Sequence, residues 1–173
     1  MEGDQRDGQG AGVIQIRPAT EADADAVWSM LEPAIRAAEV FALPADMTRE
    51  AALAYWFAAG HSVFVAELNG EIVGSYYLQA NQQGGGAHVC NCGYLTASRA
   101  QGRGVARAMC EHSLEFGKAQ GFHAMQFNFV VSTNEAAVHL WTKCGFRVLA
   151  RLPAAFLHPR LGYVDALVMW REL

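Results

Sequence analysis

The sequence predicts an α+β domain built around one mixed, mostly antiparallel β-sheet. Short apolar runs that suit strands and longer segments of helical period follow one another in the order β-α-α-β-β-β-α-β-α-β-β. Asn69-Gly70 lies between two such apolar runs and is a strong signal for a β-hairpin. The strand–helix–strand unit over residues 88–131 requires two parallel strands joined by a right-handed crossover.

Eleven segments are expected as regular elements. In chain order they are a strand at 13–18, helices from 20 to about 40 and over 49–60, strands at 62–68, 71–80 and 88–96, a helix at 101–120, a strand at 124–131, a helix from 133 or 134 to 145, and strands at 146–157 and 163–173.

Capping and breaking residues mark the ends of the first segments. Pro18 ends the first strand, because proline cannot donate to a strand ladder, and Thr20 is placed to cap the helix that follows. Pro33 could break that helix in two. Thr48 caps the next helix, and Gly60 ends it.

Glycine and asparagine mark the turns of the later segments. Asn69-Gly70 joins the second and third strands directly. Gly121 closes the long central helix, and Thr133 or Asn134 starts the next helix, which Gly145 stops. The run at 158–162 is the turn between the last two strands.

Composition bounds the class of protein. The chain has 173 residues, a net charge of −4 and 52% hydrophobic residues, which suits one globular domain over 13–173 preceded by a polar, glycine-rich tail over 1–12 that we expect to be disordered. The net charge argues against a general nucleic-acid binder, and no apolar run is long enough to span a bilayer, so we expect a cytoplasmic protein without a membrane contact. The four cysteines form no C-x-x-C pair, and we expect them to be reduced and buried rather than bound to a metal.

Residues 98–107, SRAQGRGVAR, concentrate positive charge and bare backbone at the start of a helix. The first amides of a helix are unpaired donors, and the helix dipole favours an anion there. Gly102 and Gly104 leave that backbone accessible, and Arg103 and Arg107 add charge one turn apart. The alternative is a plain glycine turn with solvated arginines. A P-loop and a dinucleotide-binding fingerprint are both excluded by the glycine spacing.

Two motifs resemble the GNAT acyltransferase superfamily. The family's Q/R-x-x-G-x-G/A signature is matched, at the turn into the long helix, by Gln101, Gly102, Arg103, Gly104, Val105 and Ala106. A second family element, on the following helix, is matched by Asn134, Ala137, Leu140, Trp141, Gly145 and Phe146. The resemblance covers roughly residues 13–173 and implies the GNAT fold, with its fourth and fifth strands splayed apart and about four helices.

The resemblance implies acetyl-CoA as the cosubstrate. The family's pyrophosphate lies on the backbone amides that correspond to 101–106. Its pantetheine pairs like an extra strand with the backbone of Tyr94, Leu95 and Thr96. In the family, the residue that corresponds to Asn134 contacts the donor. The resemblance also implies that Trp141 packs beside the donor sulfur.

A narrower likeness lies in HVCNCGYL and FNFVVSTN, which are similar to fungal N-acetyltransferases acting on proline analogues such as azetidine-2-carboxylate. The matching asparagines of those enzymes line the substrate and donor site, which implies catalytic-site roles for Asn91, Asn128 and Asn134. Independently of this likeness, the amide side chain of Asn128 lies in a mostly apolar strand and therefore needs a hydrogen-bond partner. Asn134 has an equally good structural role as a helix N-cap.

The acid and base of the reaction are not evident from the sequence. Many family members have a tyrosine where this chain has Trp141, and an indole N–H cannot act as a phenolic acid. Glu67, His88 and Asp165 are weak candidates for a base, and a base acting through water is an alternative.

The predicted function is therefore N-acetylation of a small-molecule amine, with an amino acid or proline analogue as one acceptor class. A protein or peptide N-acetyltransferase and a non-catalytic acyl-CoA-binding domain are the alternatives. Exposed strand edges are compatible with a homodimer.

Overall fold

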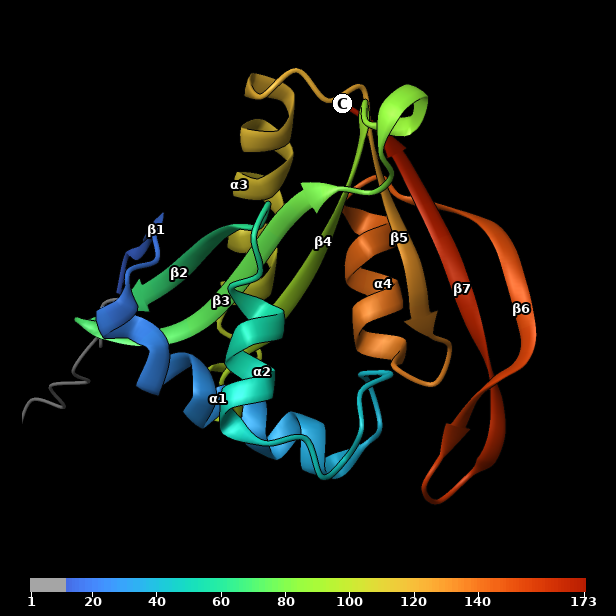
Figure 1. Cartoon of the computed structure of the whole chain (residues 1–173), viewed down its shortest axis with the longest axis horizontal. Helices are drawn as coiled ribbons and strands as arrows, with labels where there is room; N and C mark the ends of the chain where they lie inside the picture. The colour runs from blue at the N-terminus through green and yellow to red at the C-terminus, as the bar shows by residue number, and fades with distance from the viewer. Residues whose placement is uncertain (1–11) are drawn as a thin grey trace, which may run out of the picture.

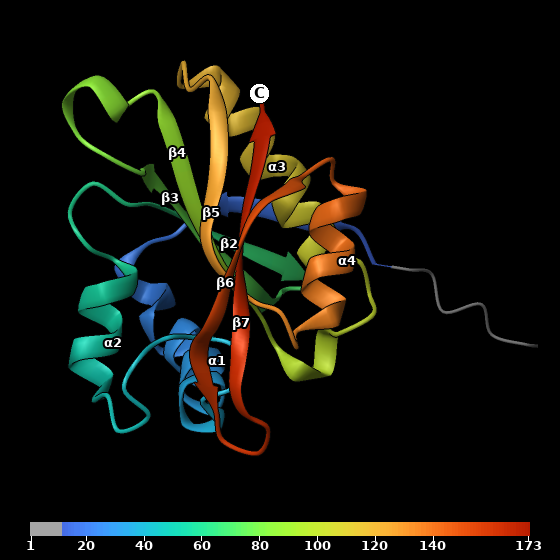
Figure 2. The ribbon, with the colours of Figure 1, turned by 90° about the vertical axis from the view of Figure 1, so that its right-hand side faces the viewer.

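The computed structural model describes residues 12–173, so the predicted tail, apart from Gly12, lies outside the described residues. The strands form one seven-stranded sheet in the order β1-β2-β3-β4-β5-β7-β6 (Figures 1 and 2). Only the β4–β5 pair is parallel within the described sheet, which confirms the mixed fold class. The strands are β1 Ile14–Pro18, β2 Ser62–Leu68, β3 Glu71–Ala80, β4 Val89–Thr96, β5 Ala124–Val131, β6 Arg147–His158 and β7 Gly162–Glu172.

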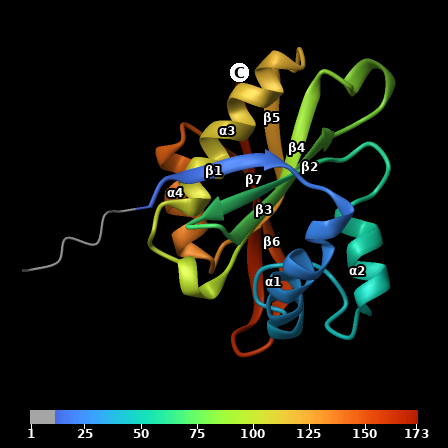
Figure 3. The ribbon, with the colours of Figure 1, turned by 90° about the vertical axis from the view of Figure 1, so that its left-hand side faces the viewer.

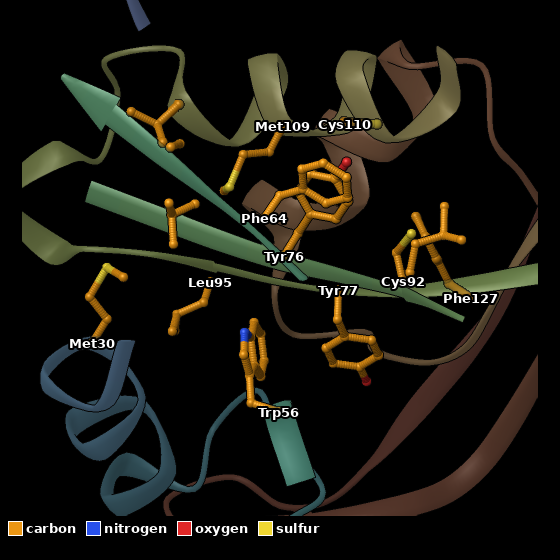
Figure 4. Close-up of a cluster of buried hydrophobic side chains, with 14 of the residues drawn as sticks. Met30, Trp56, Phe64, Tyr76, Tyr77, Cys92, Leu95, Met109, Cys110 and Phe127 are labelled. Carbon is orange, nitrogen blue, oxygen red and sulfur yellow. The ribbon is translucent and has the colours of Figure 1, made fainter. Parts of the chain in front are cut away.

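Helices cover both faces of the sheet (Figures 3 and 4). They are α1 Ala24–Ala37, α2 Arg49–Trp56, α3 Val105–Ala119 and α4 Glu135–Lys143. Because successive side chains of a strand point to opposite faces, β3 shows which helix lies on which side. Ser75 accepts a hydrogen bond from Trp56 of α2 (2.9 Å), whereas the hydroxyl of Tyr76 pairs with His112 of α3 (2.7 Å).

Three helix boundaries differ from the sequence-based expectation. α1 runs unbroken through Pro33, because that residue lies on the exposed side while the buried face stays packed. The helix ends at Ala37, and the cap residue Ala38 takes a left-handed conformation (φ 51°). α2 ends at Trp56 rather than Gly60. α3 begins at Val105 rather than Gln101, because the preceding residues form a separate turn.

The predicted hairpin and the predicted burial of the cysteines are confirmed. Asn69 and Gly70 both take positive φ (54° and 80°), as the tight turn between β2 and β3 requires. All four cysteines are buried and free, and burial raises the pKa of the Cys90 thiol to about 12, which keeps it protonated and unreactive. Across the described residues, no helix combines the length and apolar character needed to cross a bilayer.

Candidate active site

The sheet is open between its two parallel strands. β4 and β5 pair only at Val89–Ala124 and Cys90–Met125 and then diverge (Figure 1). The opposite edge of β4 stays paired with β3 as far as Thr96. Within the described sheet, the β4 edge from Asn91 onward therefore has backbone donors and acceptors without a partner strand. These include the backbone groups of Tyr94 and Thr96, whereas those of Leu95 between them face Ser75 of β3, and the alternate free groups suit an extended, amide-bearing ligand.

A two-glycine turn connects this open edge to α3. Gly102 and Gly104 both take left-handed conformations, with φ of 74° and 81°, which only glycine adopts without strain. A Cβ added at either position would meet no atom within 4 Å, so the backbone is open to approach. The first i→i−4 bond of this helix joins Ala108 N to Gly104 O (2.9 Å), and the amides of Val105 and Ala106 lie ahead of it. The turn thus fits an anion at a helix N-terminus.

The fold neutralises two of the arginines around this turn. Arg99 lies 3.5 Å from Glu71 and also donates to the carbonyl of Ile72. Arg107 pairs with Glu111 one turn along α3 (2.8 Å). Among residues 12–173, no ion pair involves Arg103, so its charge is the one in the turn most available to an anion.

Trp141 lies behind the gap on the face covered by α3 and α4. Its side chain is buried, and its ring centroid lies 4.7 Å from that of Tyr94 on β4 and 5.1 Å from that of Phe127 on β5. The indole therefore contacts one strand on each side of the opening. Contact with a donor sulfur stays a prediction.

Three carboxamides are linked on the opposite face, and we call Asn81, Gln126 and Asn128 the carboxamide cluster. Gln126 Nε2 donates to Asn128 Oδ1 (2.8 Å), and Asn128 Nδ2 donates to Asn81 Oδ1 (2.6 Å). Asn128 is exposed rather than buried, because β5 is irregular between Phe127 and Val130. Its partner Asn81 comes from the end of β3, on the far side of β4.

The other two predicted asparagines, Asn91 and Asn134, lie outside this cluster. Asn91 is half-buried and directly follows the last β4–β5 pair, so it stands at the mouth of the gap. Asn134 caps α4, where its Oδ1 accepts from the amide of Ala137 (3.3 Å), which confirms the structural role. Its proposed contact with the donor stays a prediction.

Comparison with known proteins decides the family. The model of the acetyltransferase (GNAT) family matches residues 24–146. The chain belongs to the GNAT family. This confirms the superfamily predicted from the two motifs, the class of acetyl-CoA-dependent acyltransferase and acetyl-CoA as the cosubstrate. The open β4 edge and the two-glycine turn fit that cosubstrate.

Solved and curated relatives agree with this assignment. A GCN5-related N-acetyltransferase from Kribbella flavida is 38% identical, with a TM-score of 0.88 over 92% of this chain and 98% of that one. A Salmonella typhimurium acetyltransferase, yncA, solved with its cofactor acetyl-CoA, shares the fold at 23% identity (TM-score 0.81, 93% of this chain and 94% of that one). The N-acetyltransferase aca1 of Schizosaccharomyces pombe is 32% identical over 98 residues, which are 56% of this chain and 47% of that relative. The chain thus spans about half the length of the curated relative that it matches.

The weak base candidates of this GNAT protein are otherwise engaged or lie at the periphery. Glu67 accepts from Arg17 (2.8 Å) at the far end of β2. Asp165 pairs with Arg151 (2.9 Å) and accepts from the amide of Ala154, and that backbone bond, followed by the arginine, lowers its pKa. His88 is exposed at the start of β4, with its ring edge-to-face against His123.

Three residues of this candidate site, Asn81, Gln126 and Tyr77, were not predicted from the sequence as site residues. Asn81 lies 47 residues from its partner Asn128, so only the β3–β4 pairing reveals their proximity. Gln126 could have been found, because period-two alternation places it on the same face as Asn128. Tyr77 lies directly over Gly93 of β4, where an added Cβ would come within 2.4 Å of the tyrosine ring.

Proposed function

We propose that this protein transfers the acetyl group of acetyl-CoA to the amine of a small molecule, with free amino acids and proline analogues such as azetidine-2-carboxylate as the acceptor class. The observation that carries this proposal is the carboxamide cluster, which stands beside the open β4 edge and holds neutral hydrogen-bonding groups on β5 and at the end of β3, on either side of β4.

The donor half of the proposal rests on the residues of the turn and the gap. The amides of Gln101 to Ala106 would hold the diphosphate, and Arg103, which forms no ion pair among residues 12–173, would add positive charge beside it. The backbone of Tyr94 to Thr96 would pair with the pantetheine arm, and Trp141 would pack beside the sulfur. Acetyl-CoA supplies the activated acyl group, and the chain contributes the alignment of that group with the carboxamide face.

The acceptor half rests on the chemistry of the cluster. Gln126 and Asn128 each use one N–H within the cluster and retain a second, whereas Asn81 only accepts there, and the remaining N–H groups suit the carboxylate of an amino acid. Asn91 and Asn128 would position the acceptor and steady the oxyanion, a role in which one donor contributes about 3 kcal/mol.

The segment between α1 and α2 favours a bounded site over an open peptide groove. Arg36 donates to the carbonyls of Ala45 and Met47, which fixes this segment to α1. Phe41 packs edge-on against Trp56, with ring centroids 6.4 Å apart. The likeness to aca1, an N-acetyltransferase, supports a nitrogen acceptor.

A panel of acceptors tests the proposal. Purified protein is mixed with acetyl-CoA and with free amino acids, azetidine-2-carboxylate or short peptides, and release of the CoA thiol is followed. We expect kcat/KM for the best free amino acid to exceed that for any peptide by about tenfold or more. A preference for peptides would support the protein N-acetyltransferase instead, and tight acetyl-CoA binding without any turnover would support a binding domain.

A further inference from the structure

His61 is held in one tautomer by the end of α2. It lies just before β2 and is half-buried, and its Nδ1 is 2.9 Å from the carbonyl oxygen of Trp56. A carbonyl oxygen only accepts, so Nδ1 must carry the proton. In the neutral ring, Nε2 is then an unprotonated nitrogen, and no hydrogen bond within residues 12–173 involves it.

The group that orients His61 is itself fixed. Trp56 is fully buried, and Figure 4 shows its ring beneath the strands on the side of α1 and α2. Its Nε1 donates to Ser75 Oγ (2.9 Å), and Ser75 Oγ donates to the carbonyl of Phe64 (2.8 Å). The carbonyl that orients His61 thus belongs to a residue whose side chain is itself fixed in the core by hydrogen bonds, and such support from behind the ring is typical of an oriented base.

The sheet register places His61 on the acceptor face. Its ring stacks on Tyr77, with centroids 4.2 Å apart and planes 10° from parallel. One residue beyond the Ser62–Leu78 pair, it lies level with Gln79, whose partner on β4 is Asn91. His61, Gln79 and Asn91 therefore form a polar row that leads to the mouth of the β4–β5 gap.

The surroundings of His61 leave it the titratable group best suited to accept a proton there. Tyr55 from α2 and Tyr77 from β3 face its ring, and their hydroxyls are 3.1 Å apart. Burial, followed by the Tyr55 contact, raises the pKa of Tyr77 far above its ordinary value, so that phenol stays protonated. No ion pair involves His61 among the described residues.

We propose that His61 is the general base of the reaction and accepts the acceptor's proton at Nε2, directly or through one water. The acceptor enters as an ammonium and gives one proton to Nε2. Its freed lone pair attacks the thioester carbonyl carbon, so the C–N bond forms as the carbonyl pair moves to oxygen. When that pair returns, the C–S bond breaks, and the nitrogen's second proton goes to the departing sulfur. The products are the amide, the CoA thiol and one proton that leaves His61 for solvent.

The inference rests on the proposed acetyl transfer, and His61→Asn tests it with the acceptor that the panel identifies. Asparagine keeps an N–H for the Trp56 carbonyl and removes the second ring nitrogen. We expect kcat/KM to fall by about 100-fold or more, with the decline of kcat/KM at acidic pH lost. Melting temperature and acetyl-CoA affinity, measured by calorimetry, should stay at wild-type values.

His139→Asn is the matched control, because this histidine is exposed on α4, and it should keep the wild-type rate and pH profile. His88→Asn tests the competing assignment. An unchanged pH profile in His61→Asn, or its loss in His88→Asn instead, would overturn the proposal.

Long-range nitrogen–proton NMR of the wild-type imidazole needs no turnover and separates this inference from the proposed function. We expect neutral His61 to carry its proton on Nδ1, with Nε2 bare, and His61→Asn identifies the signal. A proton on Nε2 in the neutral ring would remove the base from this site, whatever the acceptor panel shows.

Discussion

The three asparagines predicted for the site, Asn91, Asn128 and Asn134, have different surroundings. Asn134 satisfies a helix N-terminus, Asn91 stands half-buried at the mouth of the gap, and Asn128 is exposed within the carboxamide cluster. The expectation that an amide in a mostly apolar strand needs a partner is confirmed for Asn128, although this residue is exposed. It has two partners, and the irregular course of β5 exposes it to the gap.

Removing the Asn128 amide should affect rate more than stability. Asn128→Ala loses the central member of the carboxamide cluster at an exposed position, and we expect turnover to fall by about tenfold or more while the melting temperature holds. Steady-state kinetics and thermal unfolding check this. Gln120→Ala, which removes an exposed amide beyond α3, should match the wild type. Rates for Asn128→Ala within about twofold of wild type would make this asparagine structural.

Signals from residues close in sequence made some of these roles predictable, whereas other roles have no such signal. Asn134 could be predicted as a cap because the signal is contained in the few residues that follow it. Asn81 and His61 carry no such signal, because their roles arise only when strands distant in sequence become neighbours. Tautomer fixation at His61, in particular, depends on where the last carbonyl of α2 points.

At the scale of elements, the turn before α3 shows why its glycines matter. An added Cβ at Gly102 or Gly104 meets no protein atom, so the demand for glycine comes from the left-handed backbone and from the space kept clear in front of the helix. The arginines on either side are balanced by Glu71 and Glu111, acids that are not adjacent in sequence. The turn is consequently less basic than its sequence indicates.

Gly104→Trp should abolish acetyl-CoA binding, because the indole would fill the space in front of the first helical amides. Gly121→Trp provides a matched control at the opposite end of α3. Gly121 has nearly the same conformation (φ 87° against 81°), and its added Cβ also meets nothing within 4 Å. Both variants carry similar backbone strain, so only occlusion of the site separates them. Calorimetry that finds wild-type affinity in Gly104→Trp would refute the anion-site interpretation.

Element types followed from periodicity, whereas several boundaries did not. The β2–β3 hairpin was predictable because two adjacent residues determine its turn. Pro33 was misleading, because the packing of the buried face of α1 outweighs one missing backbone bond on its exposed side. The irregularity of β5 near Asn128 has no local signature, since it reflects pairing with β7.

At the scale of the whole molecule, one sheet is interrupted by the gap between β4 and β5. On each side of the gap the strands are paired, β4 with β3 and β5 with β7, and helices cover both faces of the sheet. Each half is therefore held together without hydrogen bonds across the gap. On the outer edge, β6 and its hairpin expose Leu157, Leu161 and Tyr163. The homodimer expected from such exposed edges stays a prediction.

Binding of acetyl-CoA should therefore protect a defined set of amides across the gap. If the pantetheine arm pairs with β4 and the diphosphate contacts the α3 turn, hydrogen exchange should slow at Tyr94 to Thr96 and at Gly102 to Ala106. Amides of the β6 edge should exchange at the same rate with and without ligand, because they lie two strands beyond β5.

Hydrogen exchange followed by mass spectrometry, with and without saturating acetyl-CoA, measures β4, the α3 turn and the β6 edge together in each sample. Gly104→Trp serves as the ligand-free reference for the same peptides, and Gly121→Trp should behave as the wild type. Uniform protection over all strands would indicate general stabilisation by ligand rather than completion of an open sheet. Protection at the α3 turn without protection of β4 would retain the anion site and remove the strand-like pairing, because the two contacts are made by different parts of the same ligand.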